Sequence, residues 1–155
     1  MRFFYSWAIF LREIYYLVRT QHPADTRTMK NVLLIDDDST FQFIGKALLK
    51  YVGVPPENIQ SALSGKHAID LLTSFYSAGK ALPDLILLDL NMPIMDGFGF
   101  LDAFNKLEYP DKEKAKIIVL TSSQNSTDME RARKFGVTRY MTKPLQEEAL
   151  RAELA

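Results

Sequence analysis

The feature that most constrains the fold is an alternation of short apolar runs with longer amphipathic segments after residue 30. Three of the runs, VLLI, LILL and IIVL, contain only apolar residues, as a strand buried on both faces of a sheet requires. Strands are therefore expected at five places, namely 31–35, 59–63, 85–88, 117–120 and 139–142. Since helical segments separate them, the pattern predicts five β/α units in series, which form a parallel sheet with helices on both faces.

The helical segments are recognised by apolar residues that recur every three or four positions. The first segment holds Phe41, Ile44, Leu48 and Val52, and the second holds Ala68, Leu71, Leu72 and Phe75. Ser39 and Gln42 have the spacing of a capping box, so the first helix is expected to begin there. A third helix is expected from Gly97, a fourth over 126–136 and a fifth after Pro144.

Composition excludes several classes of protein. The 155 residues favour a single domain with a substantial core. The chain carries 19 basic and 19 acidic residues, so it lacks the basic excess of a nucleic-acid-binding protein and we expect no nucleic acid among its partners. It has no cysteine, which excludes disulfides and thiolate metal sites and fits the cytoplasmic location that we expect. We also expect no membrane span, because no apolar stretch is long enough to cross a bilayer.

Polar side chains gather where the expected strands end. The first strand is followed by Asp36, Asp37 and Asp38, the third by Asp89, the fourth by Thr121 and Ser122, and the fifth by Lys143. In a parallel α/β sheet, ligands bind at the carboxyl ends of the strands. The order of the elements therefore predicts that carboxylates, a hydroxyl and an ammonium converge at one edge of the sheet.

This set of groups indicates phosphoryl chemistry with a metal ion. Crowded carboxylates repel one another unless a cation lies among them, and such a cluster suits a hard divalent cation, for which we expect Mg²⁺. The ammonium of Lys143 and the hydroxyl of Thr121 suit a phosphoryl group, whose transfer needs charge neutralisation and positioning. A carboxylate can itself accept the phosphoryl group covalently.

Two families use such groups, and they place the nucleophile differently. Residues 36–40, DDDST, read as Asp-x-Asp-x-Thr, which resembles the signature of haloacid-dehalogenase-type phosphatases. Asp36 would then be the nucleophile and Asp38 the general acid. That family needs a further acidic pair after the lysine to hold Mg²⁺, whereas the 12 residues after Lys143 contain no aspartate. The phosphatase is kept as the alternative hypothesis.

The second family matches at more positions. Residues 83–101, PDLILLDLNMPIMDGFGFL, place Asp89 at the end of a strand and just before Asn-Met-Pro and Met-Asp-Gly. With Asp36-Asp37, Thr121-Ser122 and Lys143-Pro144 in matching order, residues 30–155 strongly resemble the receiver domains of response regulators. The resemblance implies a flavodoxin-like, doubly wound (βα)5 fold with a five-stranded parallel sheet in the order 2-1-3-4-5.

The resemblance also implies how the metal and the phosphoryl group are held. Asp37, Asp89 and the backbone carbonyl of Asn91 would bind Mg²⁺, and Asp36 would assist through a water molecule. Asp89 would accept the phosphoryl group from a phosphohistidine.

Further roles follow from the same resemblance. Lys143 would pair with the phosphoryl oxygens, and Thr121 would donate a hydrogen bond to another of them. Tyr140 matches the family's switch aromatic, which moves inward when Thr121 shifts. The Lys143–Pro144 bond resembles one that is cis in receivers.

The implied function is signalling rather than enzymatic turnover. We expect a single-domain response regulator that takes its phosphoryl group from a sensor histidine kinase or a phosphotransfer protein and then changes its binding to a downstream protein. Asn91 and Ser123 would flank the path of attacking water and so tune the lifetime of the phosphoryl group. The other alternative is a degenerate receiver that is never phosphorylated, although such receivers normally lose an acid or the lysine, and this chain retains all of them.

Other polar residues are expected to have structural roles. Asp38 should stabilise the positive end of the first helix, and Asp96, next to Gly97, should serve as a turn and cap residue. His22 and His67 are expected at the surface, without a partner that would indicate catalysis.

Residues 1–28 have no counterpart in the receiver pattern, so we divide the chain into an amino-terminal extension, 1–28, and a receiver domain, 29–155. Phe4, Trp7, Leu11, Ile14 and Val18 fall on one helical face. An amphipathic helix there could pack on the domain, mediate a homodimer or lie on a membrane surface. Alternatively, Met29 is the natural start, because MKNVLLIDDD has the usual opening of a stand-alone receiver, and 1–28 would be a mis-assigned start.

Overall fold

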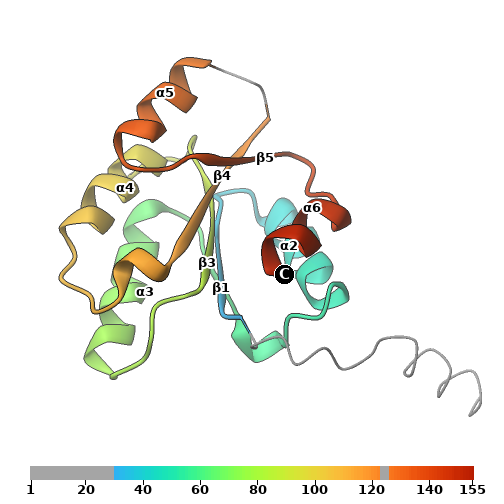
Figure 1. Ribbon diagram of the computed structural model, residues 1–155, viewed down its shortest axis with the longest axis horizontal. Helices are drawn as coiled ribbons and strands as arrows, with labels where there is room; N and C mark the ends of the chain where they lie inside the picture. The colour runs from blue at the N-terminus through green and yellow to red at the C-terminus, as the bar shows by residue number, and fades with distance from the viewer. Residues whose placement is uncertain (1–29, 123–125) are drawn as a thin grey trace, which may run out of the picture.

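The computed structural model describes residues 30–122 and 126–155. Parallel strands form a five-stranded sheet in the order β2-β1-β3-β4-β5 (Figure 1), which confirms the implied topology. The strands are β1 (Val32–Ile35), β2 (Ile59–Ala62), β3 (Leu85–Asp89), β4 (Lys116–Thr121) and β5 (Arg139–Thr142). Each expected strand is present, with bounds that differ from the prediction by one residue or less at either end.

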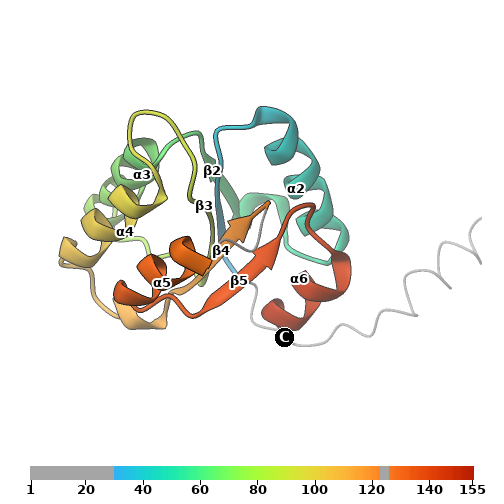
Figure 2. The ribbon, with the colours of Figure 1, turned by 90° about the horizontal axis from the view of Figure 1, so that it is seen from above.

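Helices cover both faces of the sheet. Those in the described part of the chain are α2 (Ser39–Tyr51), α3 (Gly65–Ser77), α4 (Gly97–Lys106), α5 (Ser126–Lys134) and α6 (Glu147–Leu154). Two short 3-10 helices, η1 (Pro56–Asn58) and η2 (Lys112–Lys114), lie in loops. α3, α4 and α5 lie on one face, and α2 and α6 lie on the other (Figures 1 and 2). The doubly wound arrangement that the resemblance implied is therefore confirmed.

The central strands contribute to two cores at once. In β1, Leu33 and Ile35 belong to the apolar cluster beneath α3, α4 and α5, whereas Val32 and Leu34 belong to the cluster beneath α2 and α6. All four side chains are fully buried. Successive side chains of a strand point to opposite faces, so a strand between two helical layers has to be apolar at every position. This requirement explains the uninterrupted apolar runs.

The start of α2 differs from the prediction. Asp38 is the N-cap residue, because its Oδ1 accepts hydrogen bonds from the backbone N–H groups of Thr40 (2.8 Å) and Phe41 (3.1 Å). The predicted capping box of Ser39 and Gln42 is therefore wrong: the carboxylate one residue earlier satisfies the free amides of the first turn. The separate prediction that Asp38 stabilises this end of the helix is confirmed.

The face of α2 that meets the sheet also differs from the predicted apolar stripe. The buried residues of α2 are Gln42, Gly45 and Leu49. Ile44, which the pattern placed in the core, is exposed. Gly45 lets the helix approach β1 closely, since a Cβ at this position would lie 2.9 Å from Leu34 Cδ2. The helix is thus rotated relative to the pattern so that its smallest residue faces the sheet.

Side-chain caps also begin α3 and α4. Asp96 caps α4, as predicted, because its Oδ1 accepts a hydrogen bond from the backbone N–H of Gly99 at 2.7 Å. Ser64 caps α3 by accepting a hydrogen bond from the backbone N–H of His67 at 3.1 Å. His67 is exposed, as predicted, and its Nδ1 accepts a hydrogen bond from the backbone N–H of Leu63 at 3.3 Å.

The loop between β3 and α4, residues 90–96, is tight and contains an unusual backbone angle. Ile94 has a φ of 71°, in the left-handed region that β-branched residues disfavour, and its side chain is 91% exposed. Where the loop ends, a Cβ on Gly97 would lie 2.6 Å from the carbonyl oxygen of Asp89 and 2.7 Å from Leu90 Cα. A glycine is therefore required for α4 to begin so close to the end of β3.

No helix within 30–122 and 126–155 is long and apolar enough to cross a membrane. Residues 1–28, with the proposed amphipathic helix and His22, lie outside the described residues, and so does Ser123.

Gly97→Ala is expected to destabilise the domain by roughly 1–3 kcal/mol, because the new Cβ would meet backbone atoms at the end of β3. Urea unfolding followed by circular dichroism measures the change. Gly99→Ala is the matched control: its Cβ would meet Cγ of the flexible Met95 side chain at 2.9 Å, and alanine favours a helix more than glycine does. Equal unfolding free energies of the two variants would contradict the role assigned to Gly97.

Candidate functional site

Three acidic residues lie together at the carboxyl edge of the sheet. Asp36, Asp37 and Asp89 each have a carboxylate oxygen within 4.8 Å of those of the other two. β1 and β3 are neighbours with Ile35 opposite Leu88, so the residues that come next in each strand meet. Asp36 is 0% exposed and Asp89 is 7% exposed, whereas Asp37 is open to solvent. The structure thus brings these predicted residues together.

Lys143 reaches the same place from the end of β5. Its backbone N–H donates to the carbonyl oxygen of Thr121 at 2.8 Å, which fixes it beside the end of β4. Its Nζ lies 2.5 Å from Asp36 Oδ2 and 3.5 Å from Asp89 Oδ1. The Lys143–Pro144 bond is cis, as the resemblance implied. The ammonium of Lys143 therefore supplies positive charge among the acids.

Asp36 is held from several directions. Its Oδ2 accepts a hydrogen bond from Lys143, and its Oδ1 accepts one from the backbone N–H of Asp38 at 2.9 Å. Its own backbone N–H donates to the carbonyl oxygen of Ala62, at the end of β2, at 3.1 Å. Gln42 Nε2 donates to the carbonyl oxygens of Asp36 (2.9 Å) and Ala62 (2.7 Å). Asp36 is therefore a fixed anion whose carboxylate oxygens are both engaged.

The surroundings of Asp89 disfavour the ionised form of its carboxyl group. Burial raises the pKa of its carboxyl above the ordinary value of 3.8, and the charge of Asp36 raises that pKa further. The attraction of Lys143 and a hydrogen bond from the backbone N–H of Asn91 lower it without cancelling these effects. The ionised carboxylate of Asp89 is thus less stable in the folded domain than in water, and positive charge bound beside it would relieve this cost.

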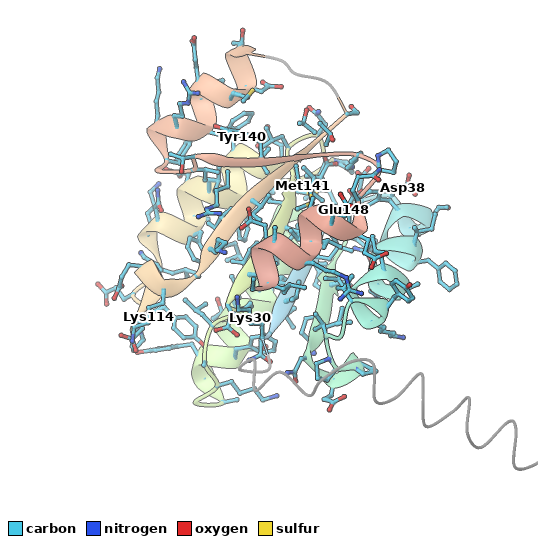
Figure 3. The ribbon with its side chains drawn as sticks, turned by 45° about the vertical axis from the view of Figure 1, so that its right-hand side comes forward. Lys30, Asp38, Lys114, Tyr140, Met141 and Glu148 are labelled. Carbon is cyan, nitrogen blue, oxygen red and sulfur yellow. The ribbon has the colours of Figure 1, made fainter. Side chains whose placement is uncertain are left out.

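Thr121 and Tyr140 lie on the neighbouring strands β4 and β5. Thr121 is half-buried at the end of β4 and lies opposite Thr142 in the β4–β5 pair. Tyr140 lies between β5 and α5 (Figure 3). Its hydroxyl donates to the carbonyl oxygens of Met129 (2.8 Å) and Val137 (3.2 Å), and its ring packs against the cluster beneath α5. In this structure the tyrosine hydroxyl therefore contacts the backbone of α5.

Two residues of α2 belong to the site although the sequence pattern placed them elsewhere. Phe41 was expected in an apolar stripe, but the centroid of its ring lies 4.4 Å from Lys143 Nζ. Gln42 was expected in a capping box, but it holds the end of β1. An amide on an apolar helix face is a signal that could have revealed Gln42, because a buried amide needs partners. No signal in the sequence relates Phe41 to so distant a lysine.

Comparison with known proteins identifies the family. Residues 32–155 match the response regulator receiver domain. The chain is 30% identical over 123 residues to a probable chemotaxis protein CheY of Rhizobium etli, an alignment that covers 79% of this chain and 88% of that protein. The chain belongs to the response regulator receiver family, a family of phosphoacceptor signalling modules rather than catalytic enzymes.

Two further similarities agree with this family. The sensor histidine kinase CheAY of Helicobacter pylori is 35% identical over 119 residues, which cover 77% of this chain and 14% of the kinase, so the chain spans a small part of that relative. The crystal structure of a two component response regulator from Cytophaga hutchinsonii has 36% sequence identity and a TM-score of 0.72, with 83% of this chain and 95% of that one covered.

The phosphatase alternative loses its support here. Its general acid, Asp38, lies at the start of α2 (Figure 3), where its carboxylate caps the helix. The family match also assigns the acids of this edge to a receiver domain. The acidic cluster of Asp36, Asp37 and Asp89 is typical of a Mg²⁺ site in such a domain.

Asp89→Asn is expected to change the pH dependence of stability. The folded-state pKa of Asp89 lies above the unfolded value, so its contribution to stability is full below the unfolded pKa and is lost as pH rises through the folded pKa. Without divalent cations, the wild type should therefore lose stability relative to Asp89→Asn between about pH 4 and pH 7. Urea unfolding at both pH values measures this loss. Asp102→Asn, at an exposed carboxylate, should behave like the wild type; parallel pH dependences of the wild type and Asp89→Asn would contradict the assignment.

Proposed function

We propose that this chain is a single-domain response regulator whose phospho-acceptor is Asp89. The observation that carries the proposal is a buried carboxylate, unfavourable as an anion, that lies 3.5 Å from the ammonium of Lys143 and beside two further acids. Phosphorylation replaces the single negative charge of the carboxylate with the larger negative charge of an acyl phosphate. An acceptor carboxylate therefore needs a metal ion and a lysine beside it, and the acids and Lys143 of this site can provide both.

The acidic cluster fits Mg²⁺ by its chemistry. Three carboxylate oxygens that lie within 4.8 Å of one another are the hard, anionic donors that a small divalent cation prefers. Asp37, Asp89 and the backbone carbonyl of Asn91 would hold the ion directly. Asp36, whose oxygens are already engaged, would act through water. When bound, the ion supplies neutralisation of the charge shared by the acceptor and the phosphoryl oxygens.

In the proposed transfer, a carboxylate oxygen of Asp89 attacks the phosphorus of a phosphohistidine on the partner. The O–P bond forms and the P–N bond breaks, its electron pair returns to the imidazole, and the imidazole takes up a proton from water. Lys143 donates to a phosphoryl oxygen, for which its ammonium has to turn from Asp36 toward Asp89. The hydroxyl of Thr121 donates to another phosphoryl oxygen.

The signal leaves the site through β4 and β5 in this proposal. Thr121 moves toward the new phosphoryl group, and Tyr140 follows it inward, so phosphorylation shifts a two-state equilibrium of the domain. The hydrogen bonds of Tyr140 to Met129 and Val137 support this route, because a change in the ring position breaks contacts with the backbone of α5 and its following turn. The surface formed by α5 and β5 then differs between the two states.

The partners follow from the chemistry. A sensor histidine kinase or a phosphotransfer protein donates the phosphoryl group, and a downstream protein binds one of the two states. The relatives support this assignment, since one of them is a sensor histidine kinase and another a probable chemotaxis protein. Residues 29–155 form the receiver domain in this proposal, and residues 1–28 are an extension outside it.

Mg²⁺ is expected to stabilise the wild-type domain, since a ligand at a hundred times its dissociation constant adds about 2.7 kcal/mol to the free energy of unfolding. Thermal unfolding with and without MgCl₂ measures the increment. Asp37→Asn should lose most of this Mg²⁺-dependent increment, because one of the proposed ligands is removed. Since Asp37 is exposed, the variant should otherwise keep its fold. Asp96→Ala, which removes a helix cap, should lower stability but keep the increment. An unchanged increment in Asp37→Asn would contradict the assignment of Asp37.

Incubation with acetyl phosphate and Mg²⁺ is expected to add one phosphoryl group, detected as a single adduct in the intact mass. Asp89→Asn should abolish the adduct, because the neutral amide is a much weaker nucleophile than the carboxylate. Loss of phosphate-ester turnover in Asp36→Asn alone would instead support the phosphatase. No adduct under any condition would support the degenerate receiver.

A further inference from the structure

The ammonium of Lys143 has a third neighbour besides the two carboxylates. Its Nζ lies 4.4 Å from the centroid of the Phe41 ring, within the range of a cation–π interaction. The other neighbours are Asp36 Oδ2 at 2.5 Å and Asp89 Oδ1 at 3.5 Å. The Lys143 side chain is only 20% exposed. The ring therefore covers a side of the ammonium that would otherwise face solvent.

Phe41 is fixed in this place by the backbone and by the core. Its N–H donates to the capping carboxylate of Asp38 at 3.1 Å. Its ring packs against the apolar cluster beneath α2 and α6, to which Leu49 and Leu150 belong. A leucine would satisfy both the helix start and the apolar contact. What an aromatic residue adds at this position is a ring face directed at a charge.

We propose that Phe41 is a positioning residue that holds the ammonium of Lys143 beside Asp89, an inference that rests on the proposed function of Asp89 as the phospho-acceptor. A ring face attracts a cation without adding negative charge to a site that already contains three carboxylates. The interaction with the ring also leaves the N–H groups of the ammonium available to donate hydrogen bonds to a carboxylate or to a phosphoryl oxygen. Lys143 can therefore exchange Asp36 for a phosphoryl oxygen while it stays against the ring.

The effect on phosphoryl transfer follows from where the charge develops. With acetyl phosphate as donor, an Asp89 oxygen forms a bond to phosphorus while the bond between phosphorus and the acetyl oxygen breaks, and acetate leaves with that electron pair. An ammonium held close to the acceptor needs only a short turn from Asp36 to reach the transferring oxygens and stabilise their charge. Without the ring, the long lysine side chain spends more of its time turned toward water, and fewer molecules are poised for transfer.

The test changes the electrostatic potential of the Phe41 ring face and keeps the shape of the ring. Phenylalanine analogues with increasing numbers of ring fluorines replace Phe41, since each fluorine weakens the negative potential of the face. The rate of adduct formation with acetyl phosphate and Mg²⁺, followed by intact mass, is expected to fall along the series. Phe41→Leu should be about three- to ten-fold slower than the wild type, and Phe41→Tyr should recover the rate.

Phe43 provides the matched control. It lies in the same helix and is 76% exposed. The same fluorinated series at Phe43, and Phe43→Leu, should leave the rate unchanged. A similar fall at both positions would overturn the proposal, because it would show a general effect of fluorine on the helix.

A second measurement reports the contact without phosphorylation. The ring current of Phe41 should shift the ε-methylene protons of Lys143 upfield in the NMR spectrum of the wild type. Phe41→Leu should abolish this shift, and Phe41→Tyr should preserve it. Urea unfolding of each variant shows whether the fold is retained.

The outcomes separate this proposal from the one on which it rests. If Phe41→Leu is slow but the rate is constant along the fluorinated series, Phe41 acts only by packing and the positioning role is overturned. A Phe41→Leu variant that is as fast as the wild type also overturns the positioning role. If the wild type forms no adduct, the proposed function fails. The ring-current shift then still decides whether Phe41 holds Lys143, and its absence in the wild type overturns the contact itself.

Discussion

The ion pair between Lys143 and Asp36 is the contact on which the rest of the structure depends. A fully buried carboxylate is costly unless it is both paired and hydrogen-bonded. The partner of Asp36 comes from across the sheet, because β3 and β4 lie between β1 and β5. To neutralise Asp36, the chain has to bring Lys143 over the ends of these two strands, next to Asp89 and Thr121. The same contact that stabilises the fold therefore assembles the site.

Much of the fold could be predicted because burial on two faces leaves a clear pattern. A strand between two helical layers has to be apolar throughout, and runs such as VLLI have no other simple explanation. The start of α2 could not be predicted in the same way. Asp38 and Ser39 are both good caps, and the choice between neighbours depends on differences of about 1 kcal/mol or less. The face that α2 turns inward depends in addition on how closely Gly45 approaches Leu34.

For the site, the sequence predicted which charged residues meet but not how they pair. The order of the strands places the acids and Lys143 at one edge. It does not say that the ammonium lies at 2.5 Å from Asp36 and at 3.5 Å from Asp89, because such a difference depends on side-chain packing. Phe41 and Gln42 escaped prediction for a related reason. Periodicity describes a helix in isolation, whereas their roles depend on the exact rotation of α2 against β1 and on the end of β5.

The backbone of Ile94 gives the loop after β3 an energetic character unlike that of the strands below it. A β-branched residue with a φ of 71° stores strain, on the order of 1–3 kcal/mol, and its exposed side chain gains little from packing in return. The strands that carry Asp36 and Asp89 are buried on both faces and would resist any displacement. The strained backbone of the loop thus destabilises the fold, whereas the burial of the strands stabilises it. A change of ligand at Asp89 would therefore displace residues 90–96 more readily than the buried strands β1 and β3.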